Sequence, residues 1–351
     1  MSLERVRIVG AGLIGTSIAL GLRAKGVAVD LLDSDEHTQS LARDLAQSAS
    51  VTSPQLVVFA LPTHSLPLVI DREYVLNPNS TFMDVGSVKV EPLVHIKNSQ
   101  LPLSQFVPTH PMAGREIGGA QSARGDLFLT RSWILTPTAE CDPARLERVC
   151  ELITLLGATA ITLDASEHDR AVAVTSHLPQ IISSLTAMSL ESAQESWLEL
   201  AGQGLRDTTR IAASDPQLWA QIIYSNREEI SRVLDGVRVN VERMMKALDD
   251  PLAIEELIAA GGKGRSRIPG KHGGSARAYT FVPIVIDDKP GQLAAIFNEC
   301  AAIGVNVEDL SIEHSPGQLN ALITLALSES DAVHLSQHLS SIGWNVHPVR
   351  K

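Results

Sequence analysis

Residues 7–15 read Arg7-Ile8-Val9-Gly10-Ala11-Gly12-Leu13-Ile14-Gly15, and an apolar helical stretch leads from them to Val29-Asp30-Leu31-Leu32-Asp33. A short apolar strand thus enters a Gly-x-Gly-x-x-Gly turn that opens a helix, and a second strand follows. The first glycine allows the tight turn, the second lets a pyrophosphate approach the backbone, and the third lets helix and strand pack closely. The helix N-terminus offers free N–H groups to the phosphates. The stretch predicts a dinucleotide site formed by Gly10, Gly12, Leu13, Ile14 and Gly15.

The acid at the end of the second strand indicates which dinucleotide binds. Asp33 lies 18 positions beyond Gly15, near the spacing of about 20 residues expected for the acid that binds the ribose 2′-hydroxyl. A carboxylate at this place would repel a 2′-phosphate. We therefore predict NAD as the cofactor, with NADP disfavoured.

The bulk composition is that of a soluble globular protein. Of the 351 residues, 44% are hydrophobic and 20% are charged, which fits two or three domains. The net charge of −11 argues against a nucleic-acid partner, because such proteins usually carry a basic surface. The sequence has neither a secretory leader nor an apolar run of about 18 residues, so we expect a cytoplasmic protein with no membrane partner. The three cysteines lack the spacing of a zinc site, and we expect no metal.

The first 165 residues alternate short apolar strands with helices. Strand candidates include Leu56–Ala60, Ser80–Asp84 and Trp133–Thr136. Such alternation is typical of a doubly wound parallel sheet. We therefore predict the α/β class, with a Rossmann-like NAD-binding domain over residues 1–165.

Residues 166–262 change to long amphipathic helices. One begins at Ser214-Asp215-Pro216, with Ser214 as the expected N-cap, and its apolar residues recur at helical spacing toward Pro251. This predicts one helix of about thirty residues. Long apolar helices often pack against a second subunit, so we expect an all-helical substrate and dimerisation domain and a homodimer. Gly261-Gly262 is expected to close the domain, and the basic residues 263–278 form either a solvated linker or a cationic flap near an anionic ligand.

Residues 279–351 form a third unit. Its signals follow the order β-α-β-β-α-β, the ferredoxin-like split arrangement, with a turn at Ser315-Pro316-Gly317 and a last helix capped by Ser330. The pieces Asp288-Lys289-Pro290-Gly291-Gln292-Leu293 and Gly304-Val305-Asn306-Val307 resemble the ACT domain, a small amino-acid-sensing module. The resemblance implies a regulatory ligand near Pro290, Gly291 and Asn306, and a unit that only helps dimers associate is the alternative.

Two segments follow strands of the predicted sheet. They read Asp84-Val85-Gly86-Ser87-Val88-Lys89 and Thr109-His110-Pro111-Met112-Ala113-Gly114-Arg115-Glu116. Both lie at the carboxyl edge, where doubly wound folds bind their ligands. A histidine there can take a proton from a substrate hydroxyl as hydride leaves for NAD. We predict His110 as this base and Ser87 as its partner; a histidine bonded to backbone and a helix-capping serine are the alternatives.

The helical region holds two further polar patches. His168 is expected to cap or pair with its neighbours, and His177 falls on a mostly apolar helix, where spacing alone favours a satisfied core histidine. The segment Gly204-Leu205-Arg206-Asp207-Thr208-Thr209-Arg210-Ile211 presents two arginines with an acid between them. Arginine is the natural bidentate partner of a carboxylate, although a surface salt-bridge cluster fits this spacing as well.

Five motifs occur in the order GAGLIG, DVGSVK, THPMAG, SHLP and RDTTRIAASDP, and together they resemble the prephenate/arogenate dehydrogenase family over residues 6–260. The resemblance implies NAD-dependent oxidative decarboxylation of prephenate to 4-hydroxyphenylpyruvate, or of arogenate to tyrosine, in tyrosine biosynthesis. The ACT-like unit matches the branch of the family that tyrosine regulates, so tyrosine is the expected effector.

The same resemblance implies roles for individual residues. His110 would be the catalytic histidine at the ring hydroxyl, and Ser87 would be its partner. Arg210 would bind a substrate carboxylate, and His177 would line the substrate pocket. Glu116 and Asp207 would position these groups.

The sequence also departs from the family pattern. Many relatives carry a second histidine where this chain has Gln180, and Arg115 and Gln203 are also unusual, so the choice between prephenate and arogenate stays open. One alternative is another NAD-dependent hydroxy-acid dehydrogenase with an ACT-like domain, which would release no carbon dioxide. The other is a non-catalytic nucleotide and amino-acid sensor, which would not need to keep Ser87, His110 and Arg210.

Overall fold

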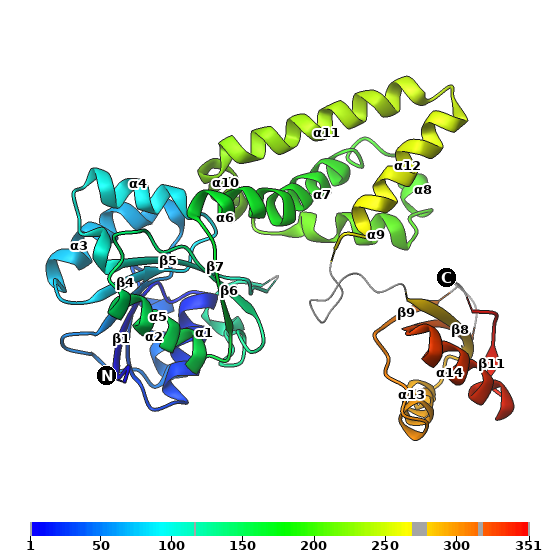
Figure 1. Ribbon diagram of the computed structural model, residues 1–351, viewed down its shortest axis with the longest axis horizontal. Coiled ribbons are helices and arrows are strands. Elements are labelled where there is room, and N and C mark those ends of the chain that lie inside the picture. Colours follow the sequence, from blue (N-terminus) through cyan, green and yellow to red (C-terminus); the bar gives the residue numbers. More distant parts are fainter. Residues whose placement is uncertain (1, 116, 269–278, 315–318, 350–351) are drawn as a thin grey trace. The chain divides into compact units, whose positions relative to one another are not determined.

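The computed structural model describes residues 2–115, 117–268, 279–314 and 319–349. The chain divides into two compact units, with the boundary between Asn240 and Val241. The first unit holds a large sheet and a group of helices, and the second holds a small sheet with its own helices (Figure 1). In the part of the chain that the structure describes, no helix has the length and apolar character needed to cross a membrane.

A seven-stranded sheet with strand order β2-β1-β3-β4-β5-β6-β7 forms the centre of the first unit (Figure 1). Strands β1 to β5 are parallel, as predicted, but β6 runs antiparallel to β5. A parallel strand needs a long crossover, usually a helix, and the described residues between β5 and β6 form turns and the short 3-10 helix Ala120–Ser122 but no α-helix. The strands are β1 (Arg5–Val9), β2 (Ala28–Leu32), β3 (Leu56–Phe59), β4 (Thr81–Asp84), β5 (Phe106–Pro111), β6 (Ser132–Leu135) and β7 (Thr159–Thr162).

Helices cover both faces of this sheet. Side chains of α1 (Leu13–Arg23), α2 (Glu36–Ala46) and α5 (Pro143–Leu155) form one core with Ile8 of β1. Side chains of α3 (Leu66–Leu76) and α4 (Val90–Asn98) form a second core with Val9 of the same strand. Neighbouring strand residues enter opposite cores because side chains alternate across a strand. The doubly wound, Rossmann-like arrangement is thereby confirmed for β1 to β5.

A run of helices follows the sheet in the chain. These are α6 (Ala165–Val172), a π turn (Ala173–His177), α7 (Leu178–Met188), α8 (Glu195–Leu198), α9 (Gln203–Thr209), the 3-10 turn η5 (Arg210–Ala213), α10 (Pro216–Ser225), α11 (Arg227–Ala247) and α12 (Pro251–Arg265). The helical character predicted for this region is confirmed.

Two details of the predicted long helix are wrong. The helix is divided at Asn226, which ends α10 and whose side-chain Nδ2 donates to the Asp169 carbonyl oxygen over 2.8 Å. The N-cap of α10 is Asp215, since its carboxylate accepts from the N–H groups of Gln217 and Leu218, whereas the Ser214 hydroxyl donates to the Ile211 carbonyl. A carboxylate reaches the first N–H groups of a helix and also suits its dipole.

The end of the helical region differs from the prediction as well. Helix α12 continues through Gly261 and Gly262 to Arg265, so this glycine pair does not close the domain. Residues 263–265 of the predicted linker therefore belong to a helix. Residues 269–278, which carry most of the proposed linker or flap, lie outside the described residues.

The C-terminal module has the predicted β-α-β-β-α-β order. Its elements are β8 (Thr280–Asp287), α13 (Gln292–Ala302), β9 (Asp309–His314), β10 (Asn320–Leu327), α14 (Glu329–Ser341) and β11 (Asn345–Val346). The four strands form an antiparallel sheet in the order β11-β8-β10-β9. The predicted cap is wrong, because Ser328, and not Ser330, accepts the N–H of Asp331 at the start of α14. The predicted turn at 315–317 lies outside the described residues.

Candidate functional site

The turn between β1 and α1 needs glycine at two positions. Gly10 has a φ of +106°, and a Cβ atom there would lie 2.1 Å from the Ala60 carbonyl oxygen. A Cβ atom on Gly15 would lie 1.9 Å from the Gly10 carbonyl oxygen. A Cβ atom on Gly12, by contrast, would meet nothing within 4 Å. The first and third glycines are thus required by packing, and the second leaves the backbone open to a ligand.

The start of α1 and the end of β2 add the groups that a dinucleotide requires. Leu13 and Ile14 begin α1, which has no acidic residue in its first turn, and their N–H groups have no acceptor within the helix. The Asp33 carboxylate lies against the turn, because Oδ2 accepts the Ala11 N–H over 2.7 Å and Oδ1 accepts the Asp35 N–H over 3.0 Å. N–H groups that can donate to phosphate and the Asp33 carboxylate, which can accept from a ribose hydroxyl, therefore lie on either side of one open stretch of backbone. These residues fit NAD.

A buried ion pair joins the carboxyl ends of β4 and β5. Asp84 and Lys89 are both 0% exposed, and Lys89 Nζ donates to Asp84 Oδ2 and, over 2.6 Å, to the Thr109 carbonyl oxygen. Asp84 also accepts the N–H groups of Gly86 and Thr109. Burial raises the pKa of Asp84 and lowers the pKa of Lys89, while the attraction between the two opposes both shifts. The pair therefore holds the backbone immediately before His110.

His110 lies near the end of β5, within the strand, and is half-buried. Its Nδ1 is 3.0 Å from His168 Nε2. Burial lowers the pKa of His110 well below its usual value, and the nearby Lys89, His168 and His177 lower it further. The imidazole is therefore neutral near pH 7 and able to accept a proton.

Ser87, the predicted partner of His110, lies in the loop between β4 and α4 and is also half-buried. The hydrogen-bonding neighbour of the His110 ring is His168. His168 also pairs with its sequence neighbour, because its Nδ1 lies 2.8 Å from Asp169 Oδ1, and this pairing was expected. The role of Ser87 stays a prediction.

The π turn places His177 in the interior. Pro179 lacks an N–H for the preceding turn, and the helix widens at Ala173–His177, just before it. His177 is 1% exposed, and its Nδ1 lies 3.2 Å from Asn226 Nδ2. Burial lowers the pKa of His177 to about 4. The satisfied buried histidine expected from spacing is confirmed.

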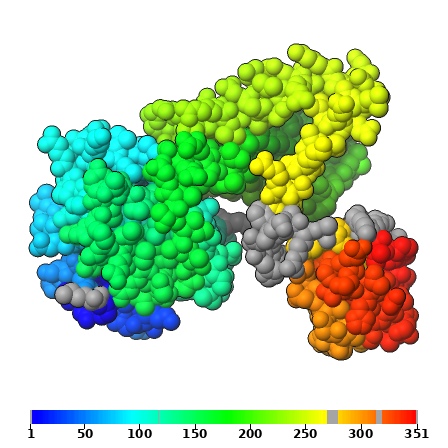
Figure 2. All heavy atoms as spheres, in the orientation of Figure 1, coloured from blue at the N-terminus to red at the C-terminus, as the bar shows by residue number. Residues whose placement is uncertain are grey.

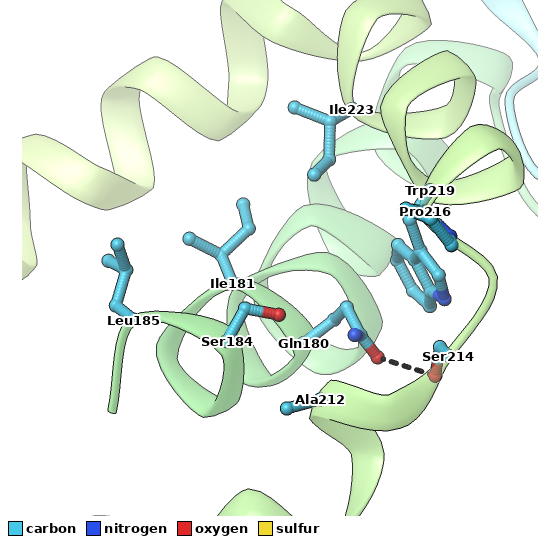
Figure 3. A pocket seen from close by; sticks show the side chains of 9 residues that line it. All are labelled: Gln180, Ile181, Ser184, Leu185, Ala212, Ser214, Pro216, Trp219 and Ile223. Atoms are coloured by element: carbon cyan, nitrogen blue, oxygen red, sulfur yellow. Dashed lines mark hydrogen bonds between the residues drawn. The ribbon is translucent and has the colours of Figure 1, made fainter. Parts of the chain in front are cut away.

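Gln180 joins the turn that carries Arg210 to helix α7. Its side chain donates to the Ile211 carbonyl oxygen over 2.9 Å. It also accepts from Ser214 Oγ over 3.3 Å, the contact marked by the dashed line in Figure 3. It also lines a cavity of about 200 Å³ with Ile181, Ser184, Leu185, Ala212, Ser214, Pro216, Trp219 and Ile223. The Trp219 ring packs edge-on against His177, with 6.2 Å between ring centroids. Arg210, exposed on η5, is thus connected through Gln180 to the helix that follows His177.

The remaining predicted substrate residues lie near Arg210 in the chain or outside the described residues. Asp207 is exposed on α9, and its Oδ1 accepts from Gln203 Nε2 over 2.7 Å. Glu116 lies outside the described residues. The roles predicted for Arg210, His177, Asp207 and Glu116 stay predictions.

Sequence reasoning assigned no role to Asp84, Lys89, Asp169 or Asn226. Asp84 and Lys89 begin and end the segment DVGSVK. An acid at the end of a strand, followed five residues later by a lysine, could have indicated the ion pair between them. Asp169 directly follows His168 and, with 2% exposure, is buried. For Asn226 no local pattern was available, because its partners are 49 and 57 residues away.

The C-terminal module has a cavity of its own. Pro290 and Gly291 line a space of about 330 Å³ together with Ile286, Asp287, Asp288, Lys289, Gln292, Leu293, Ile312 and Ala321. Gly291 has a φ of +90°, which glycine adopts without strain. Asn306, the third residue predicted here, is not among the lining residues, and its side chain donates to Glu308 Oε1 over 3.2 Å.

Comparison with known proteins agrees with this organisation. Residues 18–162 match the prephenate dehydrogenase nucleotide-binding domain, and residues 164–259 match the prephenate dehydrogenase dimerization domain. "Probable prephenate dehydrogenase NovF" of Streptomyces niveus is 30% identical over 96% of this chain and 98% of its own length.

Two further similarities lie within the same group of proteins. The prephenate dehydrogenase of Bacillus subtilis is 25% identical over 93% of each chain. A crystal structure of prephenate dehydrogenase from A. aeolicus in complex with hydroxyphenyl propionate and NAD+ has a TM-score of 0.68 at 27% identity, and the alignment covers 76% of this chain and 97% of that one. Since its sheet domain and its helical domain both match, the chain belongs to the prephenate dehydrogenase family.

Proposed function

We propose that this NAD-dependent oxidoreductase catalyses the oxidative decarboxylation of prephenate, or of arogenate, in tyrosine biosynthesis. One observation carries the proposal. His110, neutral and with its Nδ1 turned to His168, lies at the same sheet edge as the glycine turn. Strands β1 and β5 are separated by β3 and β4, so their ends lie roughly 14 Å apart at about 4.8 Å per strand. A dinucleotide bound across this edge would bring its reactive ring toward His110.

The protein's part in the reaction is to hold the substrate and to move one proton. The glycine turn and Asp33 would hold NAD, which would supply the oxidant for removal of the hydride from the ring carbon that carries the hydroxyl. His110 takes the proton of that hydroxyl at Nε2, and Ser87 helps to hold the same oxygen. Loss of the ring carboxylate as carbon dioxide then gives the aromatic product, which makes the reaction effectively irreversible.

Cations are needed to bind the substrate, because prephenate carries two carboxylates. Arg210 is proposed to bind one of them, since the guanidinium group is suited to bidentate recognition of a carboxylate. His177 is proposed to line the substrate pocket, and Asp207 and Glu116 to position these groups. Arogenate carries an amino group on the side chain where prephenate has a keto group. Gln180 and Arg115 differ from the family pattern and are proposed to influence which of the two substrates binds.

The direct test is NADH formation by the purified protein, with prephenate and arogenate offered separately and carbon dioxide measured alongside. We expect turnover of at least one of them, with one carbon dioxide released per NADH. Turnover of neither by protein that binds NAD, or NADH formation without carbon dioxide, would show that the proposed reaction is wrong.

The preference for NAD predicts a specific effect at Asp33. Changing Asp33 to Asn is expected to weaken NAD binding about tenfold, because a hydrogen bond to a charged group contributes about 1.5–3 kcal/mol, and to narrow the preference over NADP. Dissociation constants for NAD and NADP measured by calorimetry would check this, with the exposed Asp44 changed to Asn as a matched control. Unaltered NAD affinity in Asp33→Asn would exclude Asp33 from the ribose site.

The C-terminal module is proposed to be an ACT regulatory domain that binds tyrosine. Its β-α-β-β-α-β order and antiparallel sheet support this. So does the cavity at Pro290 and Gly291, whose volume of about 330 Å³ lies in the range of about 300–1,000 Å³ typical of small-molecule sites.

Tyrosine is expected to bind the full-length protein and to lower its turnover, with a larger effect than phenylalanine. Leu293 lines the cavity and is partly exposed, so Leu293→Asp is expected to weaken tyrosine binding about tenfold or more without unfolding the module. Val333→Asp, at an exposed position of α14 outside the cavity, is the matched control. Calorimetry would check this, and tyrosine affinity unchanged by Leu293→Asp would place the effector elsewhere.

A homodimer is proposed from the helical domain. Helix α11 (yellow-green) lies at the surface in Figure 2. Apolar side chains are exposed on α10, on α11 and just beyond it, among them Leu218, Tyr224, Val239, Val241, Met245 and Leu248, and exposed apolar patches mark association surfaces. Light scattering is expected to give twice the chain mass of 37.7 kDa. Met245→Glu should shift the protein toward the monomer, whereas its exposed neighbour Lys246→Glu should not. A monomeric wild-type protein would refute this assembly.

A further inference from the structure

The buried side chains of Asp169 and His168 form a chain of hydrogen bonds that ends at His110. His168 Nδ1 lies 2.8 Å from Asp169 Oδ1, and His168 Nε2 lies 3.0 Å from His110 Nδ1. His168 is 1% exposed and Asp169 is 2% exposed. The two imidazole rings meet edge to face, with an angle of 72° and 5.2 Å between centroids. Of these three residues, only the proposed base, His110, is half-buried, and the other two are fully buried.

Asp169 is fixed by further donors. Its Oδ1 accepts the Lys89 N–H over 2.8 Å, and its Oδ2 accepts the Val90 N–H over 2.9 Å. Lys89 is the N-cap residue of α4 and Val90 is its first residue, and a helix N-terminus favours a negative charge. Asn226 Nδ2 holds the Asp169 backbone carbonyl oxygen over 2.8 Å. The carboxylate therefore has a fixed position on α6 and faces His168 as an acceptor.

The chemistry of these groups sets the direction of each hydrogen bond. A carboxylate only accepts, so His168 Nδ1 must donate to Asp169. In the singly protonated form of His168, Nε2 carries the lone pair, and His110 Nδ1 must donate to it. A neutral imidazole has one N–H, so His110 Nε2 is left with its lone pair.

We propose that His168, oriented by Asp169, is a positioning residue that holds the proton of His110 on Nδ1 and keeps Nε2 basic toward the substrate hydroxyl. This inference rests on the proposed function, in which His110 is the base. During the reaction the substrate O–H bond breaks and the Nε2–H bond of His110 forms, while the Nδ1–H···Nε2 hydrogen bond to His168 is retained. The histidine therefore changes its charge without turning its ring, and the proton leaves from Nε2 after the product has gone.

The first test measures the tautomer directly and needs no turnover. The full-length protein, labelled with ¹⁵N-histidine, is examined by long-range ¹H–¹⁵N NMR at a pH where His110 is neutral, and the His110 signals are assigned by their loss in His110→Asn. We expect the Nδ1–H form. An Nε2–H form would overturn the inference, whatever substrate the enzyme uses. Absent turnover with an Nδ1–H tautomer would instead count against the proposed function.

The second test compares two substitutions at His168. His168→Leu removes the acceptor and is expected to lower kcat about 100-fold, within the usual range of a general-base effect, with KM changed less than about threefold. His168→Gln can still accept the His110 N–H through Oε1, so it is expected to keep activity at least tenfold above the leucine variant. Equal activity of the two variants would overturn the inference. If His168→Leu does not fold, the tautomer of the wild-type protein decides.

Discussion

Changing His110 to Asn is expected to lower kcat about a thousandfold while leaving NAD affinity unchanged. Removal of a general base typically costs about 10²–10⁴ in rate. The imidazole at this position is neutral because burial and the Lys89 cation lower its pKa, so it can accept a proton at Nε2. Asparagine has a similar size but no basic nitrogen. The change should therefore remove the proton acceptor with little loss of the fold.

The measurement is NADH formation under saturating substrate, with NAD affinity determined on the same preparation. His334, exposed on α14, serves as a matched control, and its change to Asn should leave the rate within about twofold. Turnover retained in His110→Asn would show that another group takes the proton. Lost activity together with lost NAD binding would show damage to the sheet edge rather than loss of a base.

The site residues whose positions in the fold were predicted correctly are those whose positions depend on nearby residues in the sequence. Gly10 and Gly15 lie within one turn, and the reason for glycine at each is a contact with the backbone within that turn or directly beside it. Asp33 directly follows the next strand, β2, so the distance along the chain from the turn to this acid is nearly fixed. His110 could be placed at the carboxyl edge because parallel strands end at the same edge of a sheet.

The parts that sequence reasoning missed depend on contacts between distant segments. Asp169 reaches the N–H groups of Lys89 and Val90 across about eighty residues, and no local pattern announces that a carboxylate on one helix will cap another. The same holds for Asn226, whose tertiary contacts divide a stretch that reads as one helix. Capping was mistaken at Ser214 because a serine and an aspartate stand side by side, and only the geometry of the turn decides between them.

The β6 strand illustrates a third kind of error. Its residues carry the apolar signal of a buried strand, and Trp133 is 0% exposed. The direction of a strand, however, depends on the segment that connects it to its neighbour and not on its own residues. The segment between β5 and β6 contains only a short 3-10 helix among its described helices, so it does not form the helical crossover that a parallel strand needs. Trp133 Nε1 donates to Thr109 Oγ1 over 2.8 Å, so this reversed strand supports the residue next to His110.

Changing Lys89 to Met is expected to destabilise the fold of the NAD-binding domain by about 3–5 kcal/mol, the usual cost of removing one partner of a buried pair. Methionine fills much of the lysine volume, so the loss is mainly electrostatic. Asp84 would keep the N–H groups of Gly86 and Thr109 but would lose its cation while remaining 0% exposed. The Thr109 carbonyl oxygen would lose the Lys89 donor as well.

The pH dependence identifies the cause of this loss. Burial already raises the pKa of Asp84, and without Lys89 it would rise further. The pKa of this carboxyl group would then be higher in the folded protein than the value of about 3.9 in the unfolded chain. The folded state therefore becomes less stable as the pH rises from the unfolded pKa to the folded pKa. The destabilisation by Lys89→Met should therefore be larger at pH 8 than at pH 5. The double variant Lys89→Met, Asp84→Asn should regain part of the lost stability at pH 8, because it has no unpaired buried carboxylate.

Urea unfolding followed by tryptophan fluorescence at both pH values would measure these differences. Lys97→Met, at an exposed position of the same helix α4, should change the unfolding midpoint little at either pH. A Lys89→Met protein as stable as the wild type at pH 8 would mean that the buried lysine contributes no net stability, as some replaced buried ion pairs do not. In that case Lys89 would be retained for the position and charge state of His110, and the variant should then lose activity while keeping its fold.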